Sequence, residues 1–578
     1  MKILPRSRWE HTVAAVLRDP ATQRQVRAAA DRMATAPEAL EEQIVSHLRI
    51  LVADHCTVAG RLLRSVAVLV YGRPEADPAV RAALVGLRRA ARTRTLVFLP
   101  AHRSYADSLL LSVALHDADL PATYRLAGEN LAFWPLSSIA RRSGMIFIRR
   151  RFGNDLSYQL AVRVYLAYLL GRGAHLEWYS EGGRSRTGRL GRPRLGLLRE
   201  LLAALDQAGV PEARIVPLTF SYALLPEARA LVDEDRGAAK PSEDPWFLLK
   251  RLTVDRRARE RPARLSLGTV FSAHDEAASS PGPGRWGAAR ALAARLRHEW
   301  GTATPLTGEA LICLALAAGH RRPRGLDCLV RELRLLLEYA AHRSIPVAAC
   351  EALTDAASLR PLIDRMCRAG VLTNAHRHDA PLYWIGRGQH HLAAYHRQTG
   401  AHWLVDRCVA ELAVLADGDE WTALPLRMHA LLDRVFLLPS ESKFLDLVAG
   451  ASSTLDLKAP SEEGARLLSR QPFLLAHRLL GAPLEAYLEA ALRHRPPAGT
   501  EPDPPGSFPR TGSRRWPESR SKELRAAGLA AAAAAERCKD GSRPRSETYL
   551  GELRSLTDRL ADIESLDDRP HPSFLEER

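Results

Sequence analysis

A histidine and an aspartate five positions apart follow a strongly apolar run. Residues 95–99 read Thr-Leu-Val-Phe-Leu, which predicts a buried strand. His102 and Asp107 lie just beyond it, and Ser104 is a good N-cap for a helix over 104–116. An imidazole beside a carboxylate can take a proton from a hydroxyl group while the carboxylate fixes its tautomer. The pattern therefore predicts a general base at a strand-to-helix corner.

The same residues also have a purely structural interpretation. Ser104 and Asp107 have the spacing of a capping box, in which Asp107 satisfies a free backbone N–H and His102 is an ordinary loop residue. Taken alone, the pair favours this structural interpretation. The polar segments farther along the chain favour the catalytic interpretation.

Three further segments combine strand-like runs with glycine or arginine. Residues 144–151 read Gly-Met-Ile-Phe-Ile-Arg-Arg-Arg, residues 181–189 read Glu-Gly-Gly-Arg-Ser-Arg-Thr-Gly-Arg, and residues 215–220 read Ile-Val-Pro-Leu-Thr-Phe. Guanidinium groups bind phosphate through paired N–H donors, and glycine lets backbone N–H groups approach it. In a chain this rich in arginine, an isolated Arg-Arg-Arg run is more typical of a solvated surface than of a phosphate site.

In order and spacing, the four segments resemble the glycerol-3-phosphate acyltransferase family, including its dihydroxyacetone-phosphate relatives. Those enzymes carry H-x4-D, G-x-x-F-I-R-R, E-G-G-R-S-R-T-G-R and a strand with V/I-P. The third segment is closer to this branch than to the lysophospholipid acyltransferases, which usually read F-P-E-G-T-R-S. The resemblance implies that His102 and Asp107 are catalytic. It assigns substrate binding to Arg103, Ser104, Gly144, Phe147, Ile148, Arg149, Arg150, Glu181, Gly182, Gly183, Arg184, Ser185, Arg186 and Pro217.

The resemblance also implies a reaction. A fatty acyl group would move from acyl-CoA or acyl carrier protein to the 1-hydroxyl of glycerol 3-phosphate, giving 1-acylglycerol 3-phosphate, the first step of phospholipid biosynthesis. We expect no cofactor and no metal. No Gly-x-Ser-x-Gly nucleophile elbow occurs in the sequence, which favours direct attack by the acceptor hydroxyl. Dihydroxyacetone phosphate stays open as the acceptor, and a non-catalytic lipid- or nucleic-acid-binding protein is a remote alternative.

The composition limits the partners. The 82 basic and 66 acidic residues give a net charge of +16, which fits phosphorylated small molecules or an anionic membrane surface. Without an RNA-binding aromatic signature or zinc-finger spacing, no nucleic-acid partner is expected. The seven cysteines have no CxxC spacing and are typical of reduced residues.

The expected product is amphiphilic, so a membrane location follows. No 18 apolar residues run together, and we expect a peripheral enzyme without a transmembrane helix at the cytoplasmic face of the cell membrane. The apolar run 62–71, flanked by Arg61 and Arg73, is a candidate lipid contact. Its other interpretation is an ordinary core helix.

The periodicity predicts an α/β fold: a central α/β acyltransferase domain with an N-terminal helical cap and a long helical C-terminal region. Helices are expected over 26–33, 40–59, 80–91, 129–143, 155–170 and 194–207, and strands over 95–99, 145–148, 174–179, 214–220 and 265–271. The expected parts are a helical domain over 1–92, the catalytic domain over 93–278, a helical domain over 286–494, a Pro/Gly-rich linker over 495–515 and a helical segment over 516–578.

Two sequence features of the C-terminal region do not by themselves assign a function. Residues 392–403 resemble the family's Y-Y-R-N…H segment but depart from it at His396 and Gln398, which leaves the role of this segment open. Several histidines between 376 and 396 lack a paired carboxylate at metal-ligand spacing, and we interpret them as a polar loop and a helix start. They are His376, His378, His390, His391 and His396.

Overall fold

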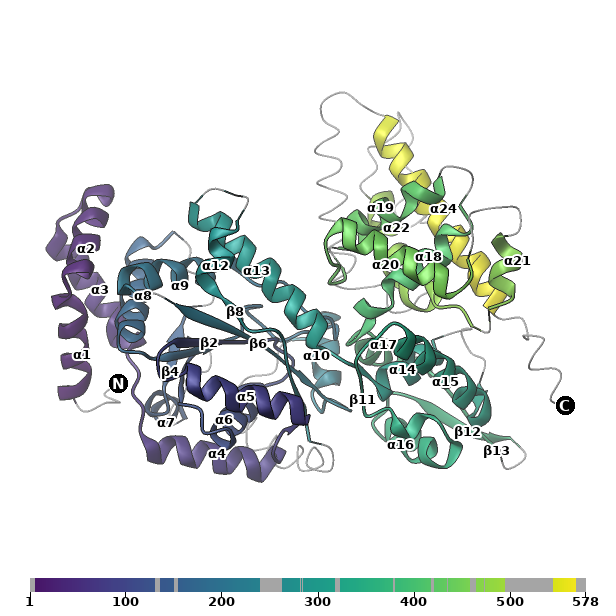
Figure 1. The fold of residues 1–578 in the computed structure, drawn as a ribbon, viewed down its shortest axis with the longest axis horizontal. Helices are drawn as coiled ribbons and strands as arrows, with labels where there is room; N and C mark the ends of the chain where they lie inside the picture. The colour runs from purple at the N-terminus through teal and green to yellow at the C-terminus, as the bar shows by residue number, and fades with distance from the viewer. Residues whose placement is uncertain are drawn as a thin grey trace. The chain divides into compact units, whose positions relative to one another are not determined.

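The chain forms two compact units (Figure 1). The first unit comprises residues 1–185, 190–226 and 240–304, and the second comprises residues 186–189, 227–239 and 305–578. The computed structural model describes residues 6–129, 136–149, 154–210, 212–239, 262–280, 282, 284–317, 323–377, 380–416, 420–433, 435–457, 464–471, 473–493 and 544–567.

A mixed eight-stranded sheet forms the centre of the first unit. Its order is β1-β7-β6-β2-β5-β3-β4, with β8 also paired to β6. Strands β6, β2, β5, β3 and β4 run parallel, so their carboxyl ends meet at one edge, where α/β folds bind ligands. The strands are β1 (Glu75–Ala76), β2 (Thr95–Pro100), β3 (Thr123–Gly128), β4 (Met145–Ile148), β5 (His175–Trp178), β6 (Ala213–Ser221), β7 (Arg264–Leu267) and β8 (Phe271–Ser272).

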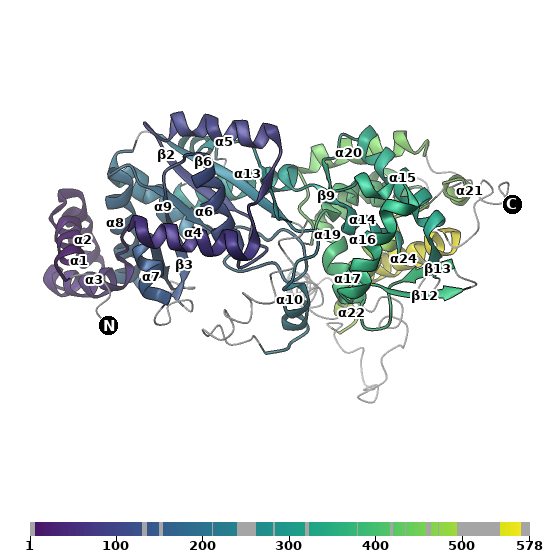
Figure 2. The ribbon, with the colours of Figure 1, turned by 90° about the horizontal axis from the view of Figure 1, so that it is seen from below.

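Helices cover both faces of this sheet (Figures 1 and 2). Alternate residues of β2 enter two separate apolar clusters: Val97 and Leu99 pack with α8, α9, α13 and α3, while Leu96 and Phe98 pack with α5 and α6. The helices of this unit are α1 (Arg6–Arg18), α2 (Pro20–Met33), α3 (Pro37–Leu51), α4 (Thr57–Tyr71), α5 (Pro78–Ala90), α6 (Asp107–Asp117), α7 (Leu136–Arg142), α8 (Leu156–Gly171), α9 (Leu195–Ala208), α12 (Ala273–Ala278) and α13 (Gly284–Ala303).

The predicted α/β class with helical regions is confirmed, and four of the five predicted strands form as single strands. The fifth, over 265–271, is two short strands, β7 and β8, which both pair with β6. Strand β3 was not predicted. Arg125 interrupts its apolar pattern, yet this arginine is buried and donates to the carbonyl and hydroxyl oxygens of Ser143 at 2.9 and 2.8 Å.

Several predicted helix boundaries are wrong, and the helix predicted over 26–33, for example, begins at Pro20. The helix predicted over 104–116 begins at Asp107, and the one predicted over 40–59 ends at Leu51, before a second helix begins at Thr57. Of the helix predicted over 129–143, residues 136–142 form α7, and residues 130–135 lie outside the described part.

The second unit is mainly helical, as predicted, but it also contains an antiparallel hairpin of β12 (Thr373–Arg377) and β13 (Ala380–Trp384). His376 lies on β12, whereas His390, His391 and His396 lie on α17; His378 falls outside the described residues. The predicted linker over 495–515 and residues 516–543 also fall outside them. The other elements are α10 (Ala228–Asp235), β9 (Leu306–Thr307), α14 (Gly308–Ala315), β10 (Arg324–Gly325), α15 (Leu326–His342), β11 (Val347–Ala348), α16 (Ala356–Arg368), α17 (His390–Arg397), α18 (Val405–Ala413), α19 (Glu420–Leu432), α20 (Glu441–Thr454), α21 (Gly464–Ser469), α22 (Ala476–Arg493) and α24 (Pro544–Asp567).

None of the described helices in either unit is long and apolar enough to cross a membrane.

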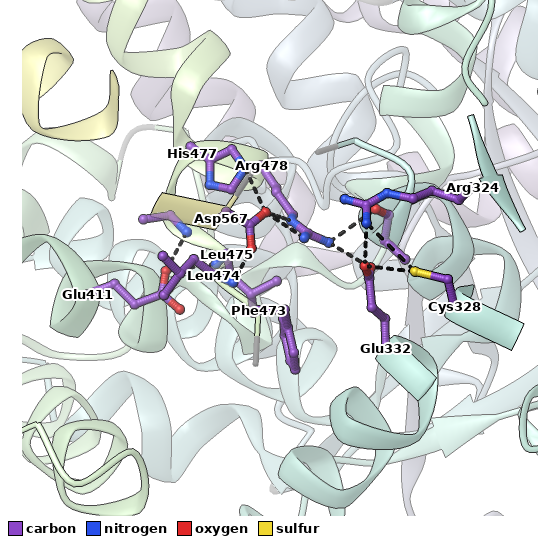
Figure 3. A network of polar contacts seen from close by, with 12 residues as sticks. Arg324, Cys328, Glu332, Glu411, Phe473, Leu474, Leu475, His477, Arg478 and Asp567 are labelled. Carbon is purple, nitrogen blue, oxygen red and sulfur yellow. Dashed lines mark hydrogen bonds and ion pairs between the residues drawn. The ribbon is translucent and has the colours of Figure 1, made fainter. Parts of the chain in front are cut away.

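A buried ionic network ties α24, the last of the described helices, to the core of the second unit (Figure 3). Arg478, on α22, donates to Asp567 Oδ2 at 2.6 Å and to Glu332 Oε2 at 3.2 Å. Asp567 Oδ1 accepts from the backbone N–H of Leu474 at 2.8 Å, and the imidazole of His477 lies 3.3 Å from Oδ2. The last residue of α24 is therefore one of two carboxylates, with Glu332, that pair with a fully buried arginine.

We expect Asp567→Asn to destabilise this unit by about 3 kcal/mol at neutral pH, because it removes the nearer of the two carboxylates that pair with the buried Arg478. Burial by itself raises the pKa of Asp567, but Arg478, together with His477, outweighs burial and holds that pKa well below its ordinary value. The stabilisation is thus present above about pH 4 and is lost as the pH falls further. Urea unfolding at pH 7 and pH 3 measures this difference.

Asp562→Asn is the matched control, since it removes an exposed carboxylate from the same helix. Equal stability of the Asp567 variant and the control at pH 7 would contradict the anchoring role of the network.

Candidate active site

The strand-to-helix corner brings His102 and Asp107 together. Strand β2 ends at Pro100, and α6 begins at Asp107, whose side chain is 0% exposed. His102 Nδ1 lies 3.1 Å from Asp107 Oδ2, and the His102 side chain is 21% exposed. An ionised carboxylate only accepts hydrogen bonds, so we assign the imidazole hydrogen to Nδ1. The Nε2 atom then carries the lone pair that a general base needs.

Asp107 also makes backbone contacts of the capping-box kind. Its Oδ2 atom accepts from the N–H groups of Arg103 at 2.7 Å and Ser104 at 2.8 Å. The Ser104 hydroxyl accepts from Ala106 N at 3.0 Å, and Ala106 is the N-cap of α6. The catalytic and the structural interpretations of the sequence are therefore compatible, although Ser104 is not the N-cap.

Two tyrosines flank this pair. Tyr179 follows β5, and its ring centroid lies 4.2 Å from that of His102. Tyr222 follows β6 and donates its hydroxyl to Asp107 Oδ1 at 2.5 Å. Because β2 lies between β6 and β5, the tyrosines approach the corner from its two neighbouring strands. Sequence reasoning missed both, although each stands within two residues of the end of a predicted strand.

A buried carboxyl group lies next to this cluster. Glu177, on β5, accepts from the hydroxyls of Ser108 at 2.7 Å and Thr123 at 3.0 Å, with the Tyr179 hydroxyl 3.5 Å away. Burial raises the pKa of Glu177, and Arg125 and these hydrogen bonds offset part of that rise. No local pattern singles out Glu177, because it lies inside a short strand.

The glycine-arginine segment is attached to the same corner. The backbone N–H of Ser185 donates to the carbonyl oxygen of His102 at 2.9 Å. Arg184 donates to the Tyr105 hydroxyl at 2.6 Å, and its guanidinium carbon lies 3.6 Å from the Tyr105 ring centroid. Arg184 is therefore held beside His102.

Glycine is required at two positions of this segment, and one is Gly188, where φ is +81° and a Cβ atom would clash with the carbonyl oxygen of Tyr395. Gly182 has a φ of +70°, and a Cβ atom there would meet Arg194 at 2.5 Å. Gly183, its neighbour, is exposed.

Glu181 begins the segment, and its Oε1 atom accepts from the N–H of Gly191 at 3.2 Å. Burial raises the pKa of Glu181 to about 7, against the opposing effects of Arg103 and of the backbone N–H groups of Gly191 and His102. The buried Arg103 thus acts electrostatically on Glu181. The backbone N–H groups of Arg103 and Ser104 are already donated to Asp107, so these two donors serve the carboxylate.

The structure places part of the second predicted segment away from His102. Gly144 precedes β4 at its amino end, opposite to the edge where His102 lies, and a Cβ atom there would meet the His55 ring at 2.3 Å. Phe147 is buried within β4 under the Arg141 guanidinium, whose central carbon is 5.1 Å from the ring centroid. Gly144 and Phe147 therefore serve packing in this structure. Ile148, half-buried, ends β4.

Arg149 follows β4 at the carboxyl edge. It donates to Asp155 Oδ2 at 2.7 Å, and its guanidinium carbon lies 4.4 Å from the Tyr158 ring centroid. Strands β5 and β3 separate β4 from β2, which places the strand ends roughly 14 Å apart at the usual strand spacing. Arg150 lies outside the described residues.

The last two predicted residues have different surroundings. Arg186 belongs to the second unit, where its Nε atom lies 3.2 Å from Glu234 Oε2 on α10. Pro217 is buried in the middle of β6, and its carbonyl oxygen accepts from Gly268 N at 3.0 Å. Pro217 contributes shape to the sheet and has no polar side-chain group.

Comparison with known proteins shows the family. Residues 81–221 match the acyltransferase family model, and residues 232–497 match the model of the glycerol-3-phosphate acyltransferase C-terminal region. The chain is 32% identical over 490 residues to proteins of Mycobacterium tuberculosis and Mycobacterium bovis named putative acyltransferase plsB1, an overlap that covers 80% of this chain and 77% of theirs. The chain belongs to the glycerol-3-phosphate acyltransferase family.

A glycerol-3-phosphate acyltransferase of Histophilus somni is 41% identical over 155 residues, 27% of this chain and 19% of that protein. The family resemblance expected from the four segments is thus confirmed, and the chain is an acyltransferase. The matched C-terminal region includes α17, whose His396 is buried; burial lowers the pKa of that imidazole to about 4. This position, where the sequence departs from the family's segment, therefore holds a neutral buried histidine.

Proposed function

We propose that this acyltransferase moves a fatty acyl group from acyl-CoA or acyl carrier protein to the 1-hydroxyl of glycerol 3-phosphate. The products are 1-acylglycerol 3-phosphate and the free thiol of the donor. Membership of the family supports the acceptor, and the chemistry of the site supports the reaction type.

The observation that carries this proposal is the contact between His102 Nδ1 and the buried Asp107 carboxylate. With Nδ1 bound in this way, Nε2 takes the proton from the acceptor hydroxyl as its oxygen attacks the thioester carbon. The carbon–sulfur bond then breaks, and the sulfur leaves with the proton returned by the imidazolium. The atoms and charges balance without a further reactant, and we propose that no cofactor takes part.

We assign Arg184 as the first phosphate-binding residue. It is held beside the His102 corner by Tyr105 and by the Ser185–His102 backbone contact, and a guanidinium presents paired donors to phosphate. Arg149 stands at the same edge but three strands away, and Asp155 neutralises its charge. Arg149 would need to leave Asp155 to bind the same phosphate.

The direct test is transfer of a labelled acyl group from acyl-CoA or acyl carrier protein to glycerol 3-phosphate, with dihydroxyacetone phosphate as the second acceptor. We expect transfer to glycerol 3-phosphate, and a loss of about a thousandfold or more in His102→Ala because its general base is missing. His116→Ala, an exposed histidine at the other end of α6, is the control.

Equal activity of the two histidine variants would exclude His102 as the base. Exclusive use of dihydroxyacetone phosphate would replace the proposed acceptor and leave the proposed mechanism intact.

We also propose that the enzyme acts as a peripheral protein on the cytoplasmic face of the membrane, with α4 lying on anionic lipid. Three large apolar side chains are exposed on one face of this helix: Val58 at 69%, Leu62 at 51% and Leu69 at 59%. The spacing of four and seven residues aligns them, and the exposed Arg61 lies beside them. Arg73, the other predicted flank, pairs with Asp117 instead.

Co-sedimentation with vesicles tests this surface. We expect the intact chain to bind vesicles containing anionic lipid and to bind neutral vesicles more weakly, and we expect the double variant Leu62→Asp, Leu69→Asp to lose about tenfold or more in partition. Val85→Asp changes an exposed apolar residue on α5 and serves as the control. Unchanged binding of the α4 variant would contradict this surface.

A further inference from the structure

We infer that Tyr222 is a positioning residue for the base: its hydroxyl holds the Asp107 carboxylate in the orientation that keeps His102 in place. This inference rests on the proposed acyl transfer and adds a residue to the His-x4-Asp pair. Tyr222 lies 115 positions from Asp107 in the sequence and reaches it from a different strand.

The two oxygens of Asp107 have different donors. Oδ2 is shared by His102 Nδ1 at 3.1 Å and by the backbone N–H groups of Arg103 and Ser104 at 2.7 and 2.8 Å. Oδ1 accepts from the Tyr222 hydroxyl at 2.5 Å. The terminal torsion of an aspartate is soft, so donors on one oxygen alone restrain the plane of the carboxylate weakly. A donor on Oδ1 fixes that plane.

The backbone that carries Tyr222 is itself well fixed. Strand β6, which ends at Ser221, pairs with β2 on one side and with β7 on the other. Asp107 begins α6, which follows β2 after the corner. The Tyr222–Asp107 hydrogen bond thus connects the end of β6 to the start of α6 and restrains the carboxylate from outside the corner.

This restraint acts when charge develops on His102. The imidazolium formed during the reaction is stabilised by Asp107 only while Oδ2 stays directed at Nδ1. Since Tyr222 acts through Asp107, its loss should slow the chemical step and leave the affinity for the acceptor nearly unchanged.

The test is Tyr222→Phe, which removes one hydroxyl and keeps the ring. We expect kcat for acyl transfer to glycerol 3-phosphate to fall about tenfold to a hundredfold, with KM for the acceptor changed by less than about threefold. Tyr168→Phe is the matched control, because it removes a phenolic hydroxyl from α8, which packs on the other face of the sheet. An unchanged kcat, or a loss that is entirely in KM, would overturn the inference.

Combination with Asp107→Asn tests whether Tyr222 acts through Asp107. We expect Tyr222→Phe to lower the residual kcat of the Asp107→Asn enzyme by less than about threefold, since their shared interaction is already lost. If Tyr222→Phe lowered kcat by the same factor in the Asp107→Asn enzyme as in the wild type, Tyr222 would act independently of Asp107. That result would contradict the positioning role.

A second measurement does not depend on the reaction. Diethyl pyrocarbonate modifies accessible neutral imidazole, and mass spectrometry of the peptide containing His102 gives the rate. We expect faster modification of His102 in Tyr222→Phe than in the wild type, with Tyr168→Phe unchanged, because the loosened carboxylate holds the ring less firmly. Equal rates would overturn the inference, whereas absent acyl transfer by the wild type would refute the proposed function alone.

Discussion

The fully buried carboxylate of Asp107 is the interaction on which the rest of the site depends. An ionised carboxylate taken out of water is stable only when its oxygens have donors. The donors come from His102, from the two backbone N–H groups between His102 and the helix, and from Tyr222 just after the neighbouring strand β6. The requirement that stabilises the strand-to-helix corner is therefore the one that orients His102, the proposed base.

The parallel sheet supplies this arrangement because neighbouring strands deliver polar residues to the same edge. The ends of β5, β2 and β6 bring Tyr179, His102 and Tyr222 together, although they are far apart in the sequence. The segment after β5 adds Arg184, which is attached to the corner through Tyr105. In the core of the second unit, a buried charge is likewise paired with an opposite charge, because Asp567 contacts the buried Arg478.

The fold and the contact between His102 and Asp107 were readable from the sequence because their signals are local. Apolar runs predicted β2, β4, β5 and β6, and the spacing of His102 and Asp107 indicated their contact. Strand β3 was missed because its Arg125 is buried through contacts with Ser143, a long-range partner that a local pattern does not show.

Long-range pairing also explains the missed site residues. Nothing near Tyr222 in the sequence reveals that β6 pairs with β2, so its contact with Asp107 emerges only in three dimensions. Conversely, Gly144 and Phe147 belong to a segment with a functional resemblance, yet the structure uses them for close packing against His55 and Arg141. A motif identifies a segment, and the strand order decides which of its side chains approach His102.

The most direct measurement is the acyl-transfer rate of His102→Ala, Asp107→Asn and the variant that combines both substitutions. If Asp107 acts by orienting His102, each single substitution lowers kcat by about a thousandfold or more, and the combined variant is no slower than the slower single variant. A near-normal rate for Asp107→Asn, or losses that multiply in the combined variant, would contradict the account.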